Sequence, residues 1–397
     1  MNCRILKISG EMNYREEMRP EKNKIGITKA MGINPLGLYE SQERQRYTKK
    51  EHSFDQNHSG DWKASVSLSL WKNINAYIQD LGHKPERFPE EAKLLSYLIN
   101  KLDLQPSEGQ MINAATSRGS IDFLSRMQLE NPSLPVWTSP HSTLGFASSW
   151  PSLLHESDSS LFFQSSTCSS FGLTLQNAFA WLSSGMADSF IAAAVECPTG
   201  QLTIDQMKAI RIYANGANNN YPCRSMDFEK EQNTMVLGEG AYAFELKKNN
   251  NNVLAYLDGV GSAVEKIHHS TELSSQGNCI LTAAKRALNA ESTSGIDLII
   301  GHFPGTKLGD IAEKNAYQTV FGNKVPYTIS NKWKIGHSLG SSLAANLDLA
   351  ISILQNQELP ALPDYIKNDC APPIAIRRIL ITALGFGGQA ICAVVGK

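Results

Sequence analysis

Three residues of this chain are of the types that carry out nucleophilic chemistry together. Cys168 lies in the serine- and threonine-rich run SSTCSS, and His302 and His337 each follow a glycine later in the chain. Covalent catalysis by cysteine needs a thiolate, groups that move or stabilise charge, and N–H donors for an oxyanion. The alternative interpretation is structural: a small residue packed in a tight turn, and two histidines that pack at the ends of apolar strands.

The residues around Cys168 predict how it is positioned. Residues 161–164 are apolar enough for an interior strand, and from Phe171 to Leu182 the apolar residues recur at the spacing of a helix with one buried face. Cys168 then lies between this strand and the helix, where helix N–H groups lack partners. The positive end of the helix dipole is expected to favour the thiolate there.

The two histidines are predicted in a similar setting. His302 ends an apolar strand, GIDLIIGHF, and is followed by Pro304, Gly305 and Thr306, while His337 follows Gly336 at the start of a helix over 336–354. All three candidate residues therefore lie near the ends of core elements.

Strands and helices alternate along the rest of the chain, which predicts α/β layers. Residues 1–60 are the least readable part, with only 2–10 resembling a strand, and 64–104 is helical. Further strands are predicted at 109–120, 188–197, 253–264 and 325–332, helices at 205–214, 279–288 and 310–321, and hairpins at 233–247 and 378–397. The runs TCSSFGLTLQNAFAWL and GHSLGSSLAANLDLAI are alike, as are LGEGAYAFEL and LGFGGQAICAVV, which predicts a duplicated unit.

Composition excludes several classes of protein. The 397 residues are 42% hydrophobic and 19% charged with a net charge of -1, so no overall field attracts nucleic acid or acidic lipid. The seven cysteines are scattered and form no CxxC pair, which argues against disulfides and metal sites. No apolar run approaches a membrane span and the N-terminus has no apolar signal core, so a soluble cytoplasmic protein is expected.

Five motifs, in order along residues 109–397, resemble those of the β-ketoacyl-acyl carrier protein synthases, the condensing enzymes of the thiolase fold. They are the Cys168 stretch, RSMDFEKEQNTMVLGEGAYAFEL, HFPGTKLGDIAE, KWKIGH and the closing GFGG at 385–388. The resemblance implies an α/β, thiolase-like fold with a duplicated αβαβα five-layer arrangement. An N-terminal half, 1–248, would carry the cysteine, with 1–60 divergent, and a C-terminal half, 249–397, would carry both histidines.

The resemblance also implies a reaction and a role for each catalytic residue. Cys168 would accept an acyl chain as a thioester, and the backbone N–H groups of Cys168 and Phe386 would form the oxyanion hole. His302 and His337 would assist the decarboxylation of a malonyl thioester and stabilise the enolate that attacks the acyl-cysteine. Phe386 would also gate the pocket between acylation and condensation.

Four further residues have supporting roles by the same resemblance. Lys332 and Glu313 would form a charged pair that holds the histidines and their water, while Thr306 and Gly387 belong to the first histidine motif and the closing loop. No metal and no organic cofactor is expected, because the acyl group arrives on the phosphopantetheine of an acyl carrier protein. Lys208 and Arg211, on the predicted helix 205–214, are candidates for contact with that acidic partner, although both are also typical of solvated helix faces.

Several positions differ from the family's pattern. Phe303 and Pro304 replace the usual Gly and Thr after the first histidine, so a hydrogen bond to the malonyl carboxylate is missing at Pro304. Trp333 replaces a serine after the lysine, and Thr167 replaces the common alanine before the nucleophile. The usual N-terminal strand with its TGxG turn is not recognisable, with KISG and INPLG as candidate remnants. These changes suggest a specialised branch. The stretches NKWKIGHSLG and YPCRSMDFEKEQNTMVLGEG resemble synthases of flexirubin-like or aryl polyene pigment pathways.

The sequence therefore predicts a β-ketoacyl-acyl carrier protein synthase of fatty acid, polyketide or polyene pigment synthesis. The alternatives are a non-decarboxylating acyltransferase or thiolase-like enzyme, a non-catalytic partner subunit of a synthase heterodimer, and a Cys–His hydrolase of another fold. The presence of Cys168, His302, Lys332 and His337 argues against a non-catalytic subunit. A homodimer is expected by the resemblance, with a heterodimer of related subunits as the other arrangement.

Overall fold

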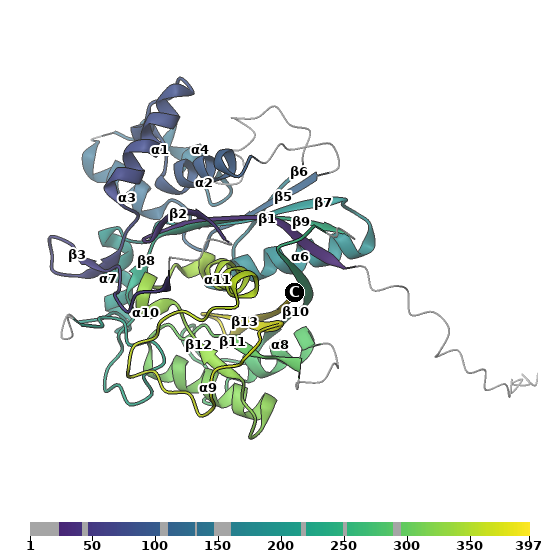
Figure 1. Ribbon diagram of the computed structural model, residues 1–397. Coiled ribbons are helices and arrows are strands. Elements are labelled where there is room, and N and C mark those ends of the chain that lie inside the picture. The colour runs from purple at the N-terminus through teal and green to yellow at the C-terminus, as the bar shows by residue number, and fades with distance from the viewer. Residues whose placement is uncertain are drawn as a thin grey trace, which may run out of the picture.

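The fold is built on a large mixed sheet (Figure 1). Helices cover its two outer faces, and two further helices pack between the two parts of the sheet. The computed structural model describes residues 24–41, 47–103, 110–131, 133–146, 160–215, 220–248, 252–288 and 295–397. The strand predicted at 2–10 lies outside these ranges. Among the described helices, none combines the length and the apolar character needed to cross a membrane.

The large sheet has eleven strands in the order β12-β11-β13-β14-β10-β1-β9-β7-β5-β6, with β2 paired to β1. They are β1 (Ile25–Asn34), β2 (Gly37–Glu40), β5 (Gln110–Ala115), β6 (Ser160–Gln164), β7 (Ser189–Glu196), β9 (Gly240–Lys248), β10 (Ala255–Val264), β11 (Leu298–Ile300), β12 (Tyr327–Ile329), β13 (Arg378–Gly385) and β14 (Gln389–Gly396). A small second sheet has the order β3-β4-β8, formed by β3 (Asp55–Gln56), β4 (Trp62–Ala64) and β8 (Leu237–Gly238).

The large sheet consists of two copies of one topology. In each copy two parallel pairings (β5 with β6 and β7; β11 with β12 and β13) are extended by antiparallel strands (β9 and β1; β14 and β10). The copies meet where β1 pairs with β10 over only two residue pairs. This repeat explains the likeness of the two halves of the sequence. The predicted boundary at 248/249 falls at the start of residues 249–251, outside the described ranges, and stays a prediction.

Three layers of helices alternate with two layers of strands (Figure 1). The helices are α1 (Leu68–Asp80), α2 (Glu90–Lys101), α3 (Ile121–Glu130), α4 (Thr138–His141), α6 (Ser170–Ser184), α7 (Gln201–Ala209), α8 (Asn278–Leu288), α9 (Lys307–Phe321), α10 (Lys332–Ile335) and α11 (Ser342–Asn356), with short 3₁₀ turns at Pro85–Arg87 and Leu339–Ser341. One outer layer packs α1 and α2 on β1, β5, β7 and β9, and the other packs α8 and α9 on β10, β13 and β14.

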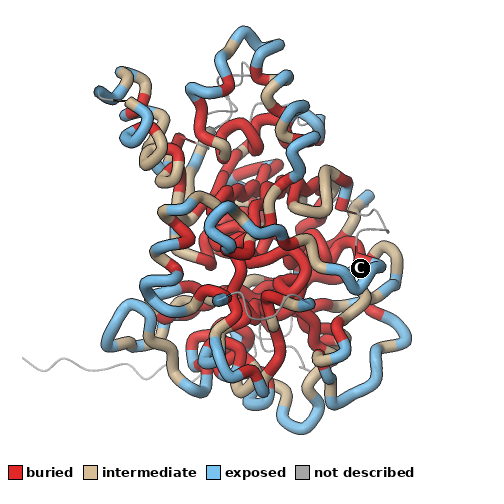
Figure 2. Tube along the Cα trace, turned by 90° about the vertical axis from the view of Figure 1, so that its left-hand side faces the viewer, coloured by how far each residue is buried: buried red, intermediate tan, exposed pale blue. Residues whose placement is uncertain are grey.

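The middle layer, α6 and α11, is buried between the two copies. Every residue of α11 from Ser342 to Leu354 is buried, as expected of a helix that contacts protein on all sides. Its apolar residues and those of α6 share one core cluster with strands of both copies, and buried residues gather through the centre of the molecule (Figure 2). The expected thiolase-like five-layer arrangement is therefore confirmed.

The structure differs from the sequence predictions in several elements. The 233–247 hairpin does not form, because β8 pairs in parallel with β4 while β9 joins the large sheet. The strand before Cys168 is not interior: β6 pairs with β5 alone among described strands, and Phe162 is 37% exposed. A missed strand, β1, runs into the INPLG segment. The helix predicted over 336–354 begins only at Ser342, and the one over 205–214 ends at Ala209.

Candidate active site

Cys168 lies on a tight turn between β6 and α6. The residue before it, Thr167, has a left-handed backbone with φ 47°, which is uncommon for a β-branched residue. Ser170 supports the turn, because its hydroxyl accepts from the Ser166 N–H at 2.8 Å and donates to the Thr167 carbonyl at 2.6 Å. A serine hydroxyl thus provides hydrogen-bond partners for the backbone of this turn. The turn places the thiol of Cys168, which is 7% exposed, just before the start of α6.

His302 follows β11 and is positioned by Glu313. One carboxylate oxygen of Glu313 accepts from the His302 N–H and the other from the Phe303 N–H, both at 2.7 Å. Glu313 lies on α9 one turn before Tyr317, whose hydroxyl also donates to it. This buried carboxylate therefore holds the backbone of the histidine loop.

His337 lies in the link between α10 and the 339–341 turn, rather than in a helix. Gly336 before it has φ 76°. The His337 N–H donates to the Val236 carbonyl at 2.7 Å, and its own carbonyl accepts from the Gly238 N–H at 3.1 Å. The segment predicted as a hairpin strand therefore holds this histidine by its backbone.

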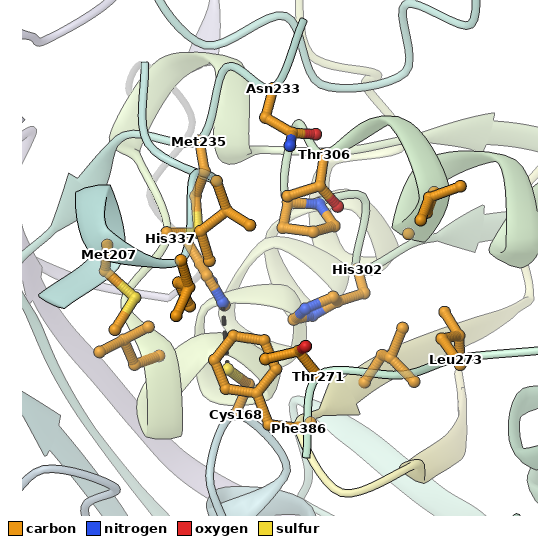
Figure 3. A pocket seen from close by; sticks show the side chains of 18 of the residues that line it. Cys168, Met207, Asn233, Met235, Thr271, Leu273, His302, Thr306, His337 and Phe386 are labelled. Atoms are coloured by element: carbon orange, nitrogen blue, oxygen red, sulfur yellow. Dashed lines mark hydrogen bonds between the residues drawn. The ribbon is translucent and has the colours of Figure 1, made fainter. Parts of the chain in front are cut away.

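The three side chains meet at one point (Figure 3). His337 Nε2 is 3.2 Å from Cys168 Sγ, and the two imidazole rings lie edge to face with centroids 4.8 Å apart. Both histidines are 2% exposed. Within the described part of the chain, Nδ1 of neither ring has a hydrogen-bond partner.

Burial governs the charge states of this group. It raises the pKa of Cys168 to about 12, with Glu196 adding to the rise and Lys332 opposing it. The helix start therefore does not produce a resting thiolate, contrary to the expectation from the sequence. Burial also holds the pKa of His302 and of His337 well below the ordinary range, helped by the positive charge of Lys332. The resting site consists of a neutral thiol and two neutral imidazoles, and the His337 ring lies within reach of the thiol proton.

Lys332 and Glu313 do not form the expected charged pair. The Lys332 ammonium, fully buried, donates to the side-chain carbonyls of Asn331 at 3.0 Å and Asn346 at 3.4 Å. No ion pair between described residues includes Lys332, although the charge of Glu313 acts on it from a distance. Burial lowers the pKa of Lys332 to about 8. The sequence identified the lysine but not its amide partners.

A cavity of about 350 Å³ opens onto Cys168, His302 and His337. The expected residues Thr306 and Phe386 line it, and Gly387 lies beside Phe386 in the turn between β13 and β14. Its walls also contain residues that the sequence did not single out: Met207, Ile210, Ile212, Asn233, Met235, Leu273, Leu308 and Leu339. Asn233, Met235 and Leu308 lie within two of the five motifs and the other residues lie outside them, so the fold rather than a motif identifies this set as the cavity wall. Their chemistry suits an apolar chain.

The two unusual residues after His302 have separate environments. Phe303, with φ 28°, is 1% exposed and its ring packs edge to face on Phe228 and Tyr317 in the core. Pro304 lines the cavity, where it offers neither an N–H nor a hydroxyl. The unusual Phe303 therefore packs in the core and does not line the cavity. The unusual Pro304 removes hydrogen-bonding groups from the cavity wall.

Lys208 and Arg211 lie near the mouth of the cavity but do not share a helix. Lys208 is on α7 and forms an ion pair with Asp61, whereas Arg211 follows the helix with φ 59° and is exposed. Between them Ile210, 40% exposed, lines the cavity.

A metal ion is the other chemistry that this group could support. The sulfur and one nitrogen of each ring lie within 4.8 Å of one another. The buried ammonium of Lys332 already disfavours positive charge on both rings, and the same repulsion would act on a cation. This repulsion disfavours a metal ion at the three side chains.

Comparisons with known proteins agree with this arrangement. The family model "Beta-ketoacyl synthase, N-terminal domain" matches residues 148–252, and "Beta-ketoacyl synthase, C-terminal domain" matches residues 254–365. A putative mitochondrial 3-oxoacyl-[acyl-carrier-protein] synthase of Schizosaccharomyces pombe is 30% identical over 53% of this chain and 55% of its own length. The 3-oxoacyl-[acyl-carrier-protein] synthase 2 of Mycobacterium leprae is 25% identical over 62% of each chain. The alignments thus span less than two thirds of these relatives.

Solved structures share the fold over nearly the whole chain. The AntDE:AntF complex of a type II PKS acyl-carrier protein with its ketosynthase has a TM-score of 0.79 at 17% identity, covering 95% of this chain and all of that one. The ketosynthase ApeO in complex with its chain length factor ApeC from Xenorhabdus doucetiae has a TM-score of 0.72 at 18% identity, covering 96% and 99%. The two family models together match more than half of the residues, the first including Cys168 and the second both histidines, and the chain belongs to the β-ketoacyl synthase family.

Proposed function

We propose that this protein condenses an acyl thioester with a malonyl thioester, each carried on an acyl carrier protein, with loss of carbon dioxide. The observation that carries the proposal is the buried thiol 3.2 Å from Nε2 of one neutral imidazole, with a second neutral imidazole beside it. A hydrolase would need access of water to this point, whereas the cavity walls around it are mostly apolar.

Acylation uses Cys168 and His337. The thiol proton passes to His337 Nε2 as sulfur attacks the acyl thioester, and the carrier's thiol leaves with a proton returned from the imidazole. The backbone N–H groups of Cys168 and Phe386 are the proposed donors to the tetrahedral oxyanion. The product is an acyl-Cys168 thioester with both histidines neutral again.

Condensation uses both imidazoles as hydrogen-bond donors. As the bond between the malonyl carboxylate carbon and the α-carbon breaks, carbon dioxide leaves and negative charge develops on the thioester oxygen. N–H groups of His302 and His337 stabilise this enolate, and its carbon then attacks acyl-Cys168 and expels the sulfur as a thiolate. The thiolate takes up one proton from solvent, which restores the neutral thiol. Neutral donors in a buried site suit a charge that exists only during the reaction. No metal or organic cofactor takes part in these steps.

Pro304 supports one second candidate function. The cavity wall lacks an N–H and a hydroxyl at this position, so the hydrogen bonds that orient the malonyl carboxylate rely on neighbours such as Thr306. An enzyme with this wall could transfer acyl groups from Cys168 without decarboxylation.

The proposed partners follow from the surface. Two exposed apolar residues, Ile210 and Leu308, line the cavity, and the basic Lys208 and Arg211 flank Ile210 in the chain, a combination that suits an acidic acyl carrier protein. The outer edge of β6 with its exposed Phe162 is the proposed contact with a second synthase subunit, identical or related. Light scattering of the purified chain separates a homodimer from a protein that needs a related partner. Localisation in the cytoplasm stays a prediction from the sequence.

Intact-protein mass spectrometry tests the reaction, with acyl- and malonyl-loaded carrier proteins and with the Cys168→Ala variant. We expect an acyl adduct only when Cys168 is present, and β-ketoacyl carrier protein and carbon dioxide once malonyl carrier protein is added. An adduct without condensation would identify an acyltransferase. No adduct on the wild-type protein, alone or as a dimer, would contradict the proposal and favour a non-catalytic subunit.

A further inference from the structure

The turn between β13 and β14 places Phe386 beside the nucleophile. Its side chain is 37% exposed and lines the cavity in front of Cys168 (Figure 3). The two residues after it are glycines with positive φ, Gly387 at 88° and Gly388 at 66°. A Cβ on Gly387 would meet no atom within 4 Å, so this part of the turn has room to change conformation.

On one side, backbone hydrogen bonds hold the turn. The Gly387 N–H donates to the Ser270 carbonyl at 3.0 Å, and the Gly388 carbonyl accepts from the Glu265 N–H at 2.9 Å. These bonds extend the pairing between β14 and β10 and are independent of side-chain type.

On the other side, hydroxyl groups of the nucleophile turn hold it. The Thr167 hydroxyl donates to the Phe386 carbonyl at 3.3 Å, and the Ser166 hydroxyl donates to the side-chain carbonyl of Gln389. A Cβ on Gly385 would collide with the Thr167 hydroxyl, so β13 can end this close to Cys168 only because residue 385 is glycine.

Thr167 adopts an unfavourable conformation to make this contact. Its φ of 47° costs on the order of 1–3 kcal/mol for a β-branched residue. Neither the turn at Cys168 nor the N-terminus of α6 needs a branched side chain, since Ser170 already satisfies the Thr167 carbonyl. The contact of the hydroxyl with the Phe386 carbonyl is the interaction that a threonine adds at this position.

We propose that Thr167 is a positioning residue that holds Phe386 over Cys168, so that breaking its hydrogen bond to the Phe386 carbonyl lets the ring swing away and admits large thioesters to the nucleophile. The inference rests on the proposed function of Cys168 as the acylated residue. It assigns Thr167 control over access, separate from the chemistry of the thiol. The backbone bonds to Ser270 and Glu265 remain and act as the hinge side of the turn.

Alkylation of Cys168 by reagents of two sizes tests this proposal without any acyl or malonyl substrate. The small reagent is iodoacetamide and the large one is N-(1-pyrenyl)maleimide, with peptide mass spectrometry assigning the rate to Cys168 rather than to the exposed Cys370. In Thr167→Val, which keeps the shape but lacks the hydroxyl, we expect the large reagent to react about fivefold faster, the size of one neutral hydrogen bond. Iodoacetamide should change by less than about twofold, and Thr167→Ser should react like the wild type.

Two controls make the result specific. Thr174→Val removes a different hydroxyl contact of 3.3 Å, from Thr174 on α6 to the side chain of Asn113 on β5. This change should leave the ratio of the two alkylation rates unchanged. In a Phe386→Ala background the Thr167→Val change should have no further effect on that ratio. An unchanged ratio in Thr167→Val, or a change that persists without the Phe386 ring, would overturn the proposal. Because alkylation needs no condensation, failure of the proposed reaction would leave this test readable.

Discussion

Replacing Lys332 by methionine should remove a pH-dependent cost of burying a charge while it impairs the site. Lys332 is 0% exposed, and among the described residues its ammonium donates to the side-chain oxygens of Asn331 and Asn346. Its pKa falls from the ordinary 10.5 to about 8. This difference corresponds to a cost of about 3 kcal/mol for burying the charge at neutral pH.

The pH dependence of this cost follows from linkage. Below pH 8 both the folded and the unfolded chain carry the proton, so the full cost applies. Between pH 8 and pH 10.5 the folded protein releases the proton and the unfolded chain keeps it, so the cost falls by about 1.4 kcal/mol per pH unit. Lys332→Met removes the titrating group, and its advantage in the free energy of unfolding should shrink by about 2 kcal/mol between pH 7 and pH 9.5.

Urea unfolding of both proteins at pH 7, 8, 9 and 9.5 measures this advantage. Methionine also leaves the oxygens of Asn331 and Asn346 without their donor, which costs about 1–3 kcal/mol at every pH. This cost lowers the difference in free energy of unfolding between variant and wild type equally at each pH, so the slope of that difference against pH is unchanged. Lys324→Met, at an exposed position, is the matched control and should give a flat difference. A Lys332→Met difference that stays constant from pH 7 to pH 9.5 would refute the reasoning.

Three further changes test the supports of the site. Asp310→Asn should lower the free energy of unfolding by about 3–5 kcal/mol, because it leaves the buried Lys230 ammonium, now 2.7 Å from the carboxylate, without a counter-charge. Urea unfolding measures this loss. The double variant Asp310→Leu, Lys230→Met should lose less, because it removes both charges. Gly238→Ala puts a Cβ against a backbone carbonyl of α10 and should cost about 1–3 kcal/mol by thermal unfolding. Glu313→Gln should slow condensation more than acylation, since it loosens the His302 loop; equal slowing of both half-reactions would contradict this role.

Strands and helices with a clean apolar pattern were predictable from the sequence, and so were the three reactive side chains. β7 and β13 are apolar runs, and the motifs select Cys168, His302 and His337, which the structure brings together. The strand β1 was missed because Thr28, Lys29 and the glycines at 26 and 32 interrupt the apolar run of IGITKAMGIN, although large side chains occupy every second position from Ile25 to Ile33. The wrong hairpin at 233–247 arose because local turn chemistry says nothing about which sheet receives each strand.

The partner of Lys332 and the charge state of Cys168 could not be predicted for a different reason. Both depend on burial between segments far apart in the chain, which residue types alone do not specify. A helix start favours a thiolate in water, but at Cys168 the loss of hydration outweighs it. The same loss of hydration keeps both imidazoles neutral.

The two halves of the chain make the site by mutual burial. The first half provides Cys168 and, through Val236 and Gly238, the backbone that holds His337. The second half provides both histidines and Lys332, which are buried because α6 and α11 pack between the two parts of the sheet. Because neutral imidazole donors require that burial, a change that loosens the α6–α11 contact should raise the pKa of the histidines and weaken stabilisation of the enolate, even where it leaves every reactive side chain in place.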